Sequence, residues 1–345
     1  MPGGRGGAAS KTWFQDLFGF EERPYKETRD LFEFGDDVLK SKANGASFHV
    51  GPFEVASVAE LRRRAAEGGA ALGECDLGGL SFKNVVGDAR GLHGAAANAG
   101  AVFQVASQFN CLEMVEPGVR PEDGVTRYYS DATQGPACAI SCAAATVFRN
   151  YFVNGSGQGR GCQVDCLAPV GELVGNAKEG YWRMSNGYCM PSGPGSIARL
   201  SGLLKADAGL AEGVSSALQV GVHWDTEVGD KNHRVCQVFS SALPVSYAKS
   251  TRSEDWQPFA QAVLDGTFSA TLAAAAVLAA QRRERVKVYL TMVGGGAFGN
   301  RTMWIIAALR AALREFEAAP LDVMMVSFMA LPRGDLLDLE KTWKK

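Results

Sequence analysis

A strand, a glycine-rich turn and a helix follow one another between Val288 and Leu309 (VYLTMVGGGAFGNRTMWIIAAL). The apolar run Val288–Val293 predicts a strand that is buried on both faces. Apolar residues at helical spacing predict an amphipathic helix after Asn300: Ile305, Leu309, Ala312 and Phe316. Adjacent glycines let backbone N–H groups approach a ligand, and a helix N-terminus favours negative charge. The stretch therefore predicts either a phosphate-binding loop or a plain tight turn in an α/β protein.

Further apolar strand segments alternate with helical patterns along the chain. The predicted strands are Phe82–Val86, Ala101–Ala106, Val235–Phe239, Val288–Val293 and Val323–Phe328. Apolar residues make up 46% of the 345 residues, which is enough for a large core. The alternation predicts a three-layer α/β/α sandwich with a mixed, mostly parallel central sheet.

The predicted α/β domain covers residues 80–330. Residues 1–12 are Gly-rich and are predicted to be a disordered tail, and residues 13–79 an N-terminal extension packed on the core. A stretch rich in Gly, Asn and Ser, about 154–234, is too long for a bare loop and is predicted to be an insertion. Residues 331–345 are predicted to be a charged C-terminal tail.

Charge and hydropathy exclude several classes of protein. A net charge of −2 argues against bulk nucleic-acid binding and against binding to anionic membranes. No apolar run approaches the roughly 20 residues of a membrane span, and no secretory signal is visible. We expect an intracellular protein, cytoplasmic or nuclear.

The eight cysteines predict free thiols in a reducing compartment, because they are spread over a long chain without a C-x-x-C pair. Cys162, Cys166 and Cys189 could be imagined as zinc ligands. Their spacing is poor and no histidine lies nearby, so neither a metal site nor a cofactor is predicted.

Four segments that are distant in sequence are expected to meet at one edge of the sheet, because ligands of such sheets bind beyond the carboxyl ends of strands. Gly87-Asp88, Asn110 and Gly294–Asn300 each follow a predicted strand, and the turn Gln134–Cys138 comes soon after one of them. That turn begins a second helix, which Thr133 or Asp131 could cap. The edge of the sheet is therefore predicted to hold phosphate.

The order of these motifs resembles an ADP-ribose-binding macrodomain over residues 80–330. In that family the aspartate of an early Gly-Asp accepts a hydrogen bond from the adenine amino group, which corresponds to Asp88. An asparagine after the next strand contacts the distal ribose, which corresponds to Asn110. Two glycine-bearing turns wrap the diphosphate, and TQGPACAI and GGGAFGN stand in their places. The second loop is similar to the poly(ADP-ribose) glycohydrolase branch, where its aromatic residue lies near the distal ribose.

The resemblance implies a ligand that is ADP-ribose or an ADP-ribosylated macromolecule. It also implies a set of ligand-binding residues from four segments: Asp88, Ala89, Asn110, Gln134, Gly135, Pro136, Ala137, Cys138, Gly294, Gly295, Gly296, Ala297, Phe298, Gly299 and Asn300. Asn300 could instead cap the following helix.

The catalytic residues of the family are not matched. Ala137 stands where mono-ADP-ribosyl hydrolases usually carry an aspartate, and the paired glutamates of the glycohydrolase branch are absent after the first loop. The candidate acids are Glu113, Glu116 and Asp131. Asp131 is nearest in sequence to the loop and is the predicted catalytic residue. Hydrolysis of ADP-ribosyl linkages and non-catalytic reading of ADP-ribose both remain open.

A different enzyme class is predicted if Cys138 is a nucleophile. It lies in the first turn of a predicted helix, where the helix dipole lowers a thiol pKa. With Gln134 upstream and His223 or His233 as base, it could serve a hydrolase or acyltransferase. A structural protein that keeps the fold without a ligand is the third alternative.

Overall fold

A seven-stranded sheet forms the centre of the computed structural model, which describes residues 12–72, 77–131, 133–229, 231–249 and 251–343. The strand order is β4-β9-β10-β6-β11-β12-β5. The strands are β4 (Phe53–Ser57), β5 (Ser81–Val86), β6 (Val102–Ala106), β9 (Gln219–Glu227), β10 (Arg234–Ser240), β11 (Val286–Leu290) and β12 (Leu321–Ser327). From β10 to β5 all neighbours are parallel, whereas β9 is antiparallel to β10 and β4. The predicted mixed, mostly parallel sheet is confirmed.

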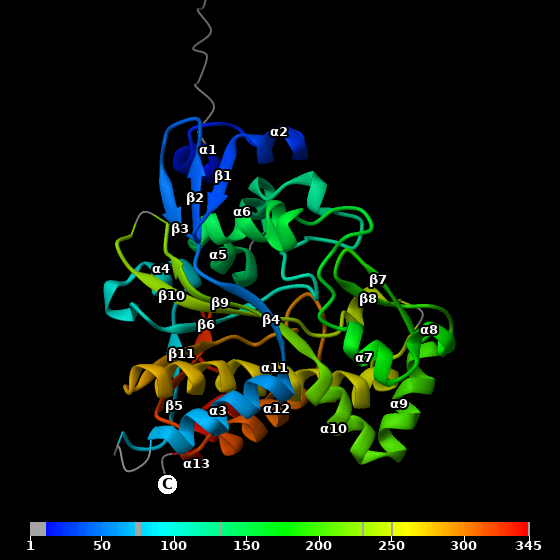
Figure 1. Cartoon of the computed structure of the whole chain (residues 1–345). Helices are drawn as coiled ribbons and strands as arrows, with labels where there is room; N and C mark the ends of the chain where they lie inside the picture. The colour runs from blue at the N-terminus through cyan, green and yellow to red at the C-terminus, as the bar shows by residue number, and fades with distance from the viewer. Residues whose placement is uncertain (1–11, 73–76, 132, 230, 250, 344–345) are drawn as a thin grey trace, which may run out of the picture.

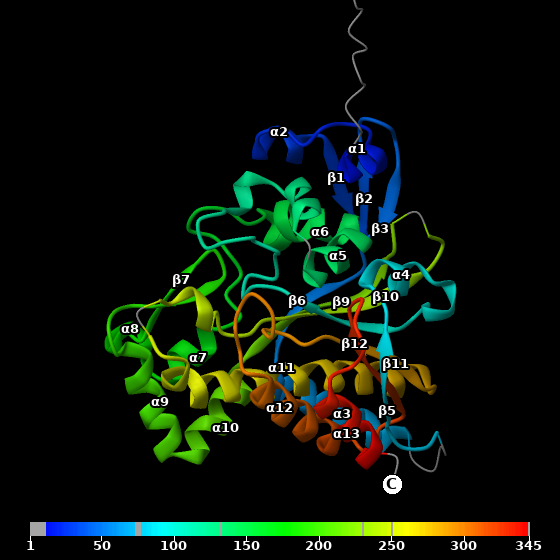
Figure 2. The ribbon, with the colours of Figure 1, turned by 180° about the vertical axis from the view of Figure 1, so that it is seen from behind.

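Helices cover both faces of this sheet (Figures 1 and 2). One layer holds α3 (Val58–Leu72), α11 (Ser253–Arg282), α12 (Thr302–Glu315) and α13 (Gly334–Trp343). The opposite layer holds α4 (Ala89–Gly94), α5 (Gln134–Ser141) and α6 (Ala143–Tyr151). The three-layer α/β/α architecture predicted from the sequence is thus present.

Helix α11 is the centre of its layer. Among the described residues it is the one helix that is long and apolar enough, by length and composition, to cross a membrane. However, 94% of its most apolar window is buried inside the protein. Small residues let α3 lie close against it: a Cβ on Gly68 would come within 2.7 Å of the Ala280 Cβ. The low-charge composition of α11 therefore fits a core helix, which is apolar all round.

Two strands of the central sheet come from segments predicted not to belong to the core of the α/β domain, one before residue 80 and one within the insertion. β4 belongs to the predicted N-terminal extension, and β9 to the predicted insertion. The rest of the extension forms α1 (Trp13–Phe18), α2 (Tyr25–Asp30) and a small antiparallel sheet of β1 (Phe32–Gly35), β2 (Val38–Ser41) and β3 (Ser47–His49). The domain boundaries remain a prediction, but the sheet draws on sequence from both sides of them.

The rest of residues 154–234 is mainly helical. It forms α7 (Ala168–Leu173), α8 (Asn176–Glu179), α9 (Ser196–Ala206), α10 (Ala208–Ala217) and a hairpin of β7 (Trp182–Ser185) and β8 (Tyr188–Pro191). These elements lie together beside one end of α11 (Figure 1). At the other end of the chain, the predicted charged tail forms α13, whose Leu336 and Leu339 are buried and whose Trp343 indole donates to the Leu80 carbonyl. Residues 1–11 of the predicted N-terminal tail are outside the described residues.

Candidate functional site

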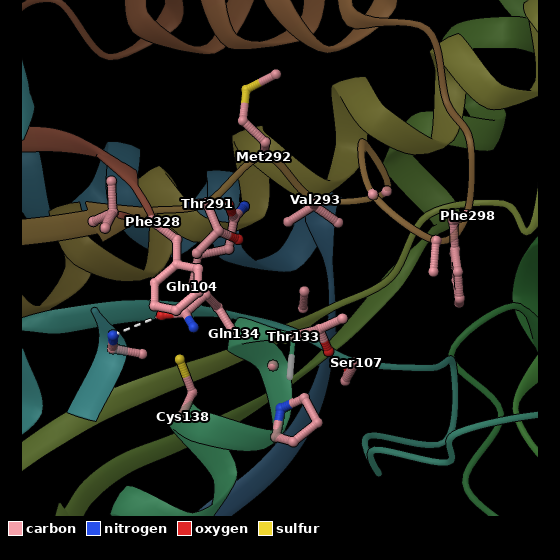
Figure 3. A pocket seen from close by; sticks show the side chains of 18 of the residues that line it. Gln104, Ser107, Thr133, Gln134, Cys138, Thr291, Met292, Val293, Phe298 and Phe328 are labelled. Atoms are coloured by element: carbon pink, nitrogen blue, oxygen red, sulfur yellow. Dashed lines mark hydrogen bonds between the residues drawn. The ribbon is translucent and has the colours of Figure 1, made fainter. Parts of the chain in front are cut away.

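A cavity of about 430 Å³ lies at the carboxyl ends of the parallel strands. Its lining includes residues that directly follow β6, β11 and β12, such as Ser107, Thr291 and Phe328. One wall is the start of α5 and the opposite wall is the loop Gly294–Asn300 (Figure 3). The sheet therefore brings together the two glycine-bearing turns that the sequence placed far apart, at the edge where such sheets bind ligands.

The first turn of α5 lies close to β6 because Gly135 has no side chain. A Cβ on Gly135 would lie 2.1 Å from the Ala106 carbonyl oxygen, so the first turn of α5 can approach β6 only with glycine there. Thr133, the N-cap residue of α5, makes no side-chain capping bond. Asp131 instead accepts from the Thr133 N–H at 2.8 Å. Gln134, Gly135, Pro136 and Cys138 line the cavity.

The opposite wall presents backbone N–H groups. The carbonyl oxygens of Gly296, Ala297 and Phe298 all accept hydrogen bonds, from the Gly299 N–H, the Ser246 hydroxyl and the Ser246 N–H respectively. The N–H groups of the same three residues have no protein acceptor among the described residues. Consecutive N–H groups in a loop of this kind form a site for an anion. The loop therefore has the donors that a phosphate requires.

Asn300 shapes this loop and does not cap the helix after it. Its side-chain amide donates to the Leu243 carbonyl at 2.8 Å and to the Gly294 carbonyl at 3.3 Å, while its own N–H donates to Gly294 O at 2.9 Å. The N-cap of α12 is Arg301. Gly295, Gly299 and Asn300, all predicted ligand residues, are not among the residues that line the cavity.

Asn110, the predicted ribose contact, lies beneath the cavity wall. It is fully buried, its side chain donates to Gln163 at 3.0 Å, and it accepts from the Leu112 N–H at 3.1 Å. Cys111 beside it has a left-handed backbone (φ 60°). The chain turns at this point, so the residues that reach the cavity are Gln108, Glu113 and Met114.

Asp88 lies in a shallow hollow that adjoins the cavity. It caps α4 by accepting from the Gly91 N–H at 2.9 Å. The hollow is also lined by Ala137 and by the exposed side chains Tyr129, Phe328 and Met329. Ala89 lines the main cavity, and its N–H donates to the Gln134 side-chain oxygen at 2.8 Å (Figure 3). Asp131, Thr133, Gln134 and Phe328 line both spaces, which therefore form one continuous cleft.

Glu113 is the buried carboxyl of the site. Its side chain lines the cavity, only 4% of the residue is exposed, and Oε1 has no hydrogen-bond partner. Its Oε2 lies against the first turn of α5, 2.6 Å from where a Cβ on Gly135 would stand. Burial raises the pKa of Glu113 well above its usual value; the charge of Arg149 opposes this and that of Asp131 adds to it. Burial thus favours the neutral, protonated form of Glu113 at the cavity wall.

Sequence reasoning preferred Asp131 to Glu113 because Asp131 is nearer the loop in the chain. No local pattern marks Glu113, since its burial comes from elements that are distant in sequence. Its own N–H donates to the Tyr128 hydroxyl at 3.0 Å, which fixes the backbone beside the carboxyl.

A buried arginine supports the turn that precedes Glu113. Arg149 donates from Nε to the Cys111 carbonyl at 3.0 Å and from Nη2 to the Thr146 hydroxyl at 3.0 Å. Its Nη1 lies 3.1 Å from His223 Nδ1, and the guanidinium covers the Phe239 ring at 3.7 Å. Burial lowers the pKa of Arg149 to about 10, so it stays charged at neutral pH. Arg149 thus stabilises the turn at Cys111. The polar groups around its guanidinium compensate the burial of the charge.

The geometry does not support Cys138 as a nucleophile. Its side chain is buried, and burial together with the nearby Glu113 raises the pKa of the thiol well above its usual value. His223 is occupied by Arg149, and His233 pairs with the His93 carbonyl at 2.7 Å. A neutral buried thiol without a base is unreactive.

In the part of the chain that the structure describes, no three His, Cys, Asp or Glu side chains are grouped to hold a metal ion. Seven cysteines are described and all are free thiols, and Cys75 lies outside the described residues.

No family model matches the chain, and no curated protein matches it in sequence. Similar solved structures exist. One is a poly(ADP-ribose) glycohydrolase from Deinococcus radiodurans in complex with ADP-ribose, with 9% identity, a TM-score of 0.43, and coverage of 85% of this chain and 94% of that one. Another is the glycohydrolase from Thermomonospora curvata, with 13% identity, a TM-score of 0.43, and coverage of 89% and 93%. The latter enzyme bound to the inhibitor ADP-HPD gives 12% identity, a TM-score of 0.42, and coverage of 90% and 94%.

Proposed function

We propose that the protein binds an ADP-ribosyl group in this cleft and hydrolyses the bond between the distal ribose and the group attached to it. The observation on which the proposal rests is Glu113. It is a buried carboxyl whose pKa is raised by burial, with one oxygen that has no hydrogen-bond partner among the described residues, in a cavity whose loop wall has unpaired backbone N–H groups. A carboxyl that is still protonated at neutral pH can give a proton to a glycosidic leaving oxygen.

The diphosphate is assigned to the N–H groups of Gly296, Ala297 and Phe298 and to the uncapped start of α5 across the cavity. Both bind anions through oriented backbone dipoles, without a cluster of cationic side chains. Backbone donors of this kind can hold a negatively charged ligand although the net charge of the protein is itself −2.

The two ends of the ligand are proposed to lie in the two parts of the cleft. The adenine occupies the hollow, where Asp88 accepts from its amino group and the exposed rings of Tyr129 and Phe328 offer stacking surfaces. The distal ribose lies between Phe298 and Glu113, both of which line the cavity.

In the reaction, Glu113 donates its proton to the leaving oxygen as the bond from that oxygen to the anomeric carbon breaks. The resulting carboxylate then accepts a proton from the water that attacks this carbon, as in other glycosidic hydrolyses. Asp131, the residue predicted from the sequence, is the neighbouring carboxylate whose charge helps to keep Glu113 protonated.

Binding and release of ADP-ribose test the proposal in two steps. Calorimetry with ADP-ribose on the wild-type protein tests binding, and release of ADP-ribose from an ADP-ribosylated protein tests hydrolysis. Glu113→Gln is expected to keep binding and to lower the release rate by about 10²- to 10⁴-fold. Glu116→Gln is the matched control, because Glu116 is exposed and does not line the cavity.

Three outcomes count against parts of the proposal. No heat at millimolar ADP-ribose overturns the ligand. Binding without release by the wild-type protein overturns hydrolysis and leaves a reader of ADP-ribosylation. An equal loss of rate in the two variants overturns the role of Glu113.

A further inference from the structure

The segment between β12 and α13 forms one side of the cavity mouth. Phe328, Ala330, Leu331 and Arg333 from this segment line the cavity. Met329 and Leu331 are 82% and 86% exposed, and residues 328–332 take part in no hydrogen bond among the described residues. The segment is thus anchored at its two ends only, by β12 and by α13.

Arg333 is the only lining residue of the cavity, among those that the structure describes, with a cationic side chain. The acidic lining residues are Glu113, whose neutral form is favoured by burial, and Asp131. A ligand that bears a diphosphate brings about two negative charges into this space. The loop amides supply only partial charges, so among the described residues Arg333 is the one full positive charge at the wall of the cavity itself, while Arg90 lines the adjoining hollow.

The Arg333 side chain has little to hold it elsewhere. Its Nε lies 3.5 Å from an Asp335 oxygen, which is longer than a hydrogen bond of good geometry, and the Arg333 side chain is 62% exposed. Exposed pairs of this kind contribute little to stability. The guanidinium can therefore exchange this contact for a phosphate, which it matches with two parallel N–H donors.

We infer that Arg333 recognises the diphosphate of the bound ligand and so sets the preference of the cleft for a phosphorylated nucleoside sugar. The inference rests on the proposed ADP-ribose ligand and adds a specificity-determining side chain to the backbone donors. Phe328 and Leu331 lie in the same segment at the mouth, so a ligand in contact with Arg333 is also screened from water by apolar side chains. Lower water content around the pair strengthens its electrostatic attraction.

The test is calorimetry of ADP-ribose binding by the wild-type protein and three variants. Arg333→Gln is expected to weaken ADP-ribose binding about tenfold. This loss is smaller than that for a fully buried charge-assisted contact, because the side chain stays partly exposed to solvent. Arg333→Lys keeps the positive charge but loses the bidentate geometry, so its affinity for ADP-ribose is expected to lie between those of the wild type and Arg333→Gln. Arg310→Gln makes the same change of charge at an exposed position of α12 that does not line the cavity, and binding is expected to stay within twofold of wild type.

Salt dependence separates a direct contact from the general field of the protein. Between about 50 mM and about 200 mM salt, the ADP-ribose affinity of the wild type should fall more steeply than that of Arg333→Gln, because the variant lacks one full charge at the interface. Equal affinities for wild type and Arg333→Gln, or equal losses in the Arg333→Gln and Arg310→Gln variants, overturn the role of Arg333 while the proposed function stands. Absence of ADP-ribose binding by the wild-type protein overturns both.

Discussion

Replacing Gly135 by alanine tests the packing on which the candidate site depends. In an ordinary helix this change is stabilising, by up to about 1 kcal/mol, because alanine loses less backbone freedom on folding than glycine. At Gly135 the new Cβ would stand 2.1 Å from the Ala106 carbonyl oxygen and 2.6 Å from Glu113 Oε2. A carbon atom normally stays about 3.5 Å from a non-bonded neighbour, so the first approach is too close by about 1.4 Å and the second by about 0.9 Å.

The clash cannot be relieved by a simple side-chain rotation, since Ala106 O belongs to the backbone at the end of β6. Either α5 moves away from the sheet or Glu113 leaves its place. Overpacking of this kind costs about 1–3 kcal/mol, which exceeds the gain in helix propensity. We therefore expect Gly135→Ala to lower the free energy of unfolding by about 1–2 kcal/mol and to abolish turnover.

Chemical denaturation followed by circular dichroism measures this difference. Gly202→Ala is the matched control, because Gly202 lies within α9 and a Cβ there would meet no atom within 4 Å. That variant should be as stable as the wild type or slightly more so. A Gly135→Ala protein that gains stability as Gly202→Ala does would refute the close approach of α5 to β6 and the position of Glu113 that follows from it.

Three further predictions concern titrating groups. Burial raises the pKa of Glu113, so the folded state holds this proton more tightly than the unfolded state. In urea titrations the free energy of unfolding of the wild type relative to Glu113→Gln should therefore fall as pH rises above 4.5, the usual pKa of a glutamate. Burial lowers the pKa of His93 from 6.5 to about 4, so between these pH values only the unfolded state binds the proton. As pH falls through this range, the wild type should lose up to about 3 kcal/mol of its free energy of unfolding relative to His93→Gln. In a Cys75→Ser background an alkylating reagent should modify exposed Cys162 first and buried Cys138 slowly, and mass spectrometry that finds Cys138 modified first would contradict its position in the core.

The sequence predicted the fold class and the two walls of the site because both depend on local signals. Buried strands appear as apolar runs and the helix after Asn300 as a 3.6-residue period, whichever residues they later contact. The loop Gly294–Asn300 was likewise visible as glycines between a strand and a helix. The fold rules for parallel sheets then place such turns at a common edge.

Tertiary structure decided which side chains face the cavity. Asn110 and Glu113 are three residues apart in one irregular segment, and no periodicity tells which of them reaches the cavity. The left-handed Cys111 and the contacts of Asn110 with Gln163 turn Asn110 inward and leave Glu113 at the wall. These contacts join positions more than fifty residues apart, so they cannot be inferred from either segment alone.

For the same reason, the sequence could not predict that Arg333 lines the cavity or that β4 and β9 belong to the central sheet. Arg333 belongs to a stretch predicted as a charged tail, and it becomes part of the cavity because α13 packs on β5. The strands β4 and β9 join the sheet through antiparallel pairing between distant segments. Local chemistry thus determined the α/β layers and the two glycine-bearing turns, whereas long-range packing decided the burial of Glu113, the position of Arg333 at the cavity and the edge of the sheet.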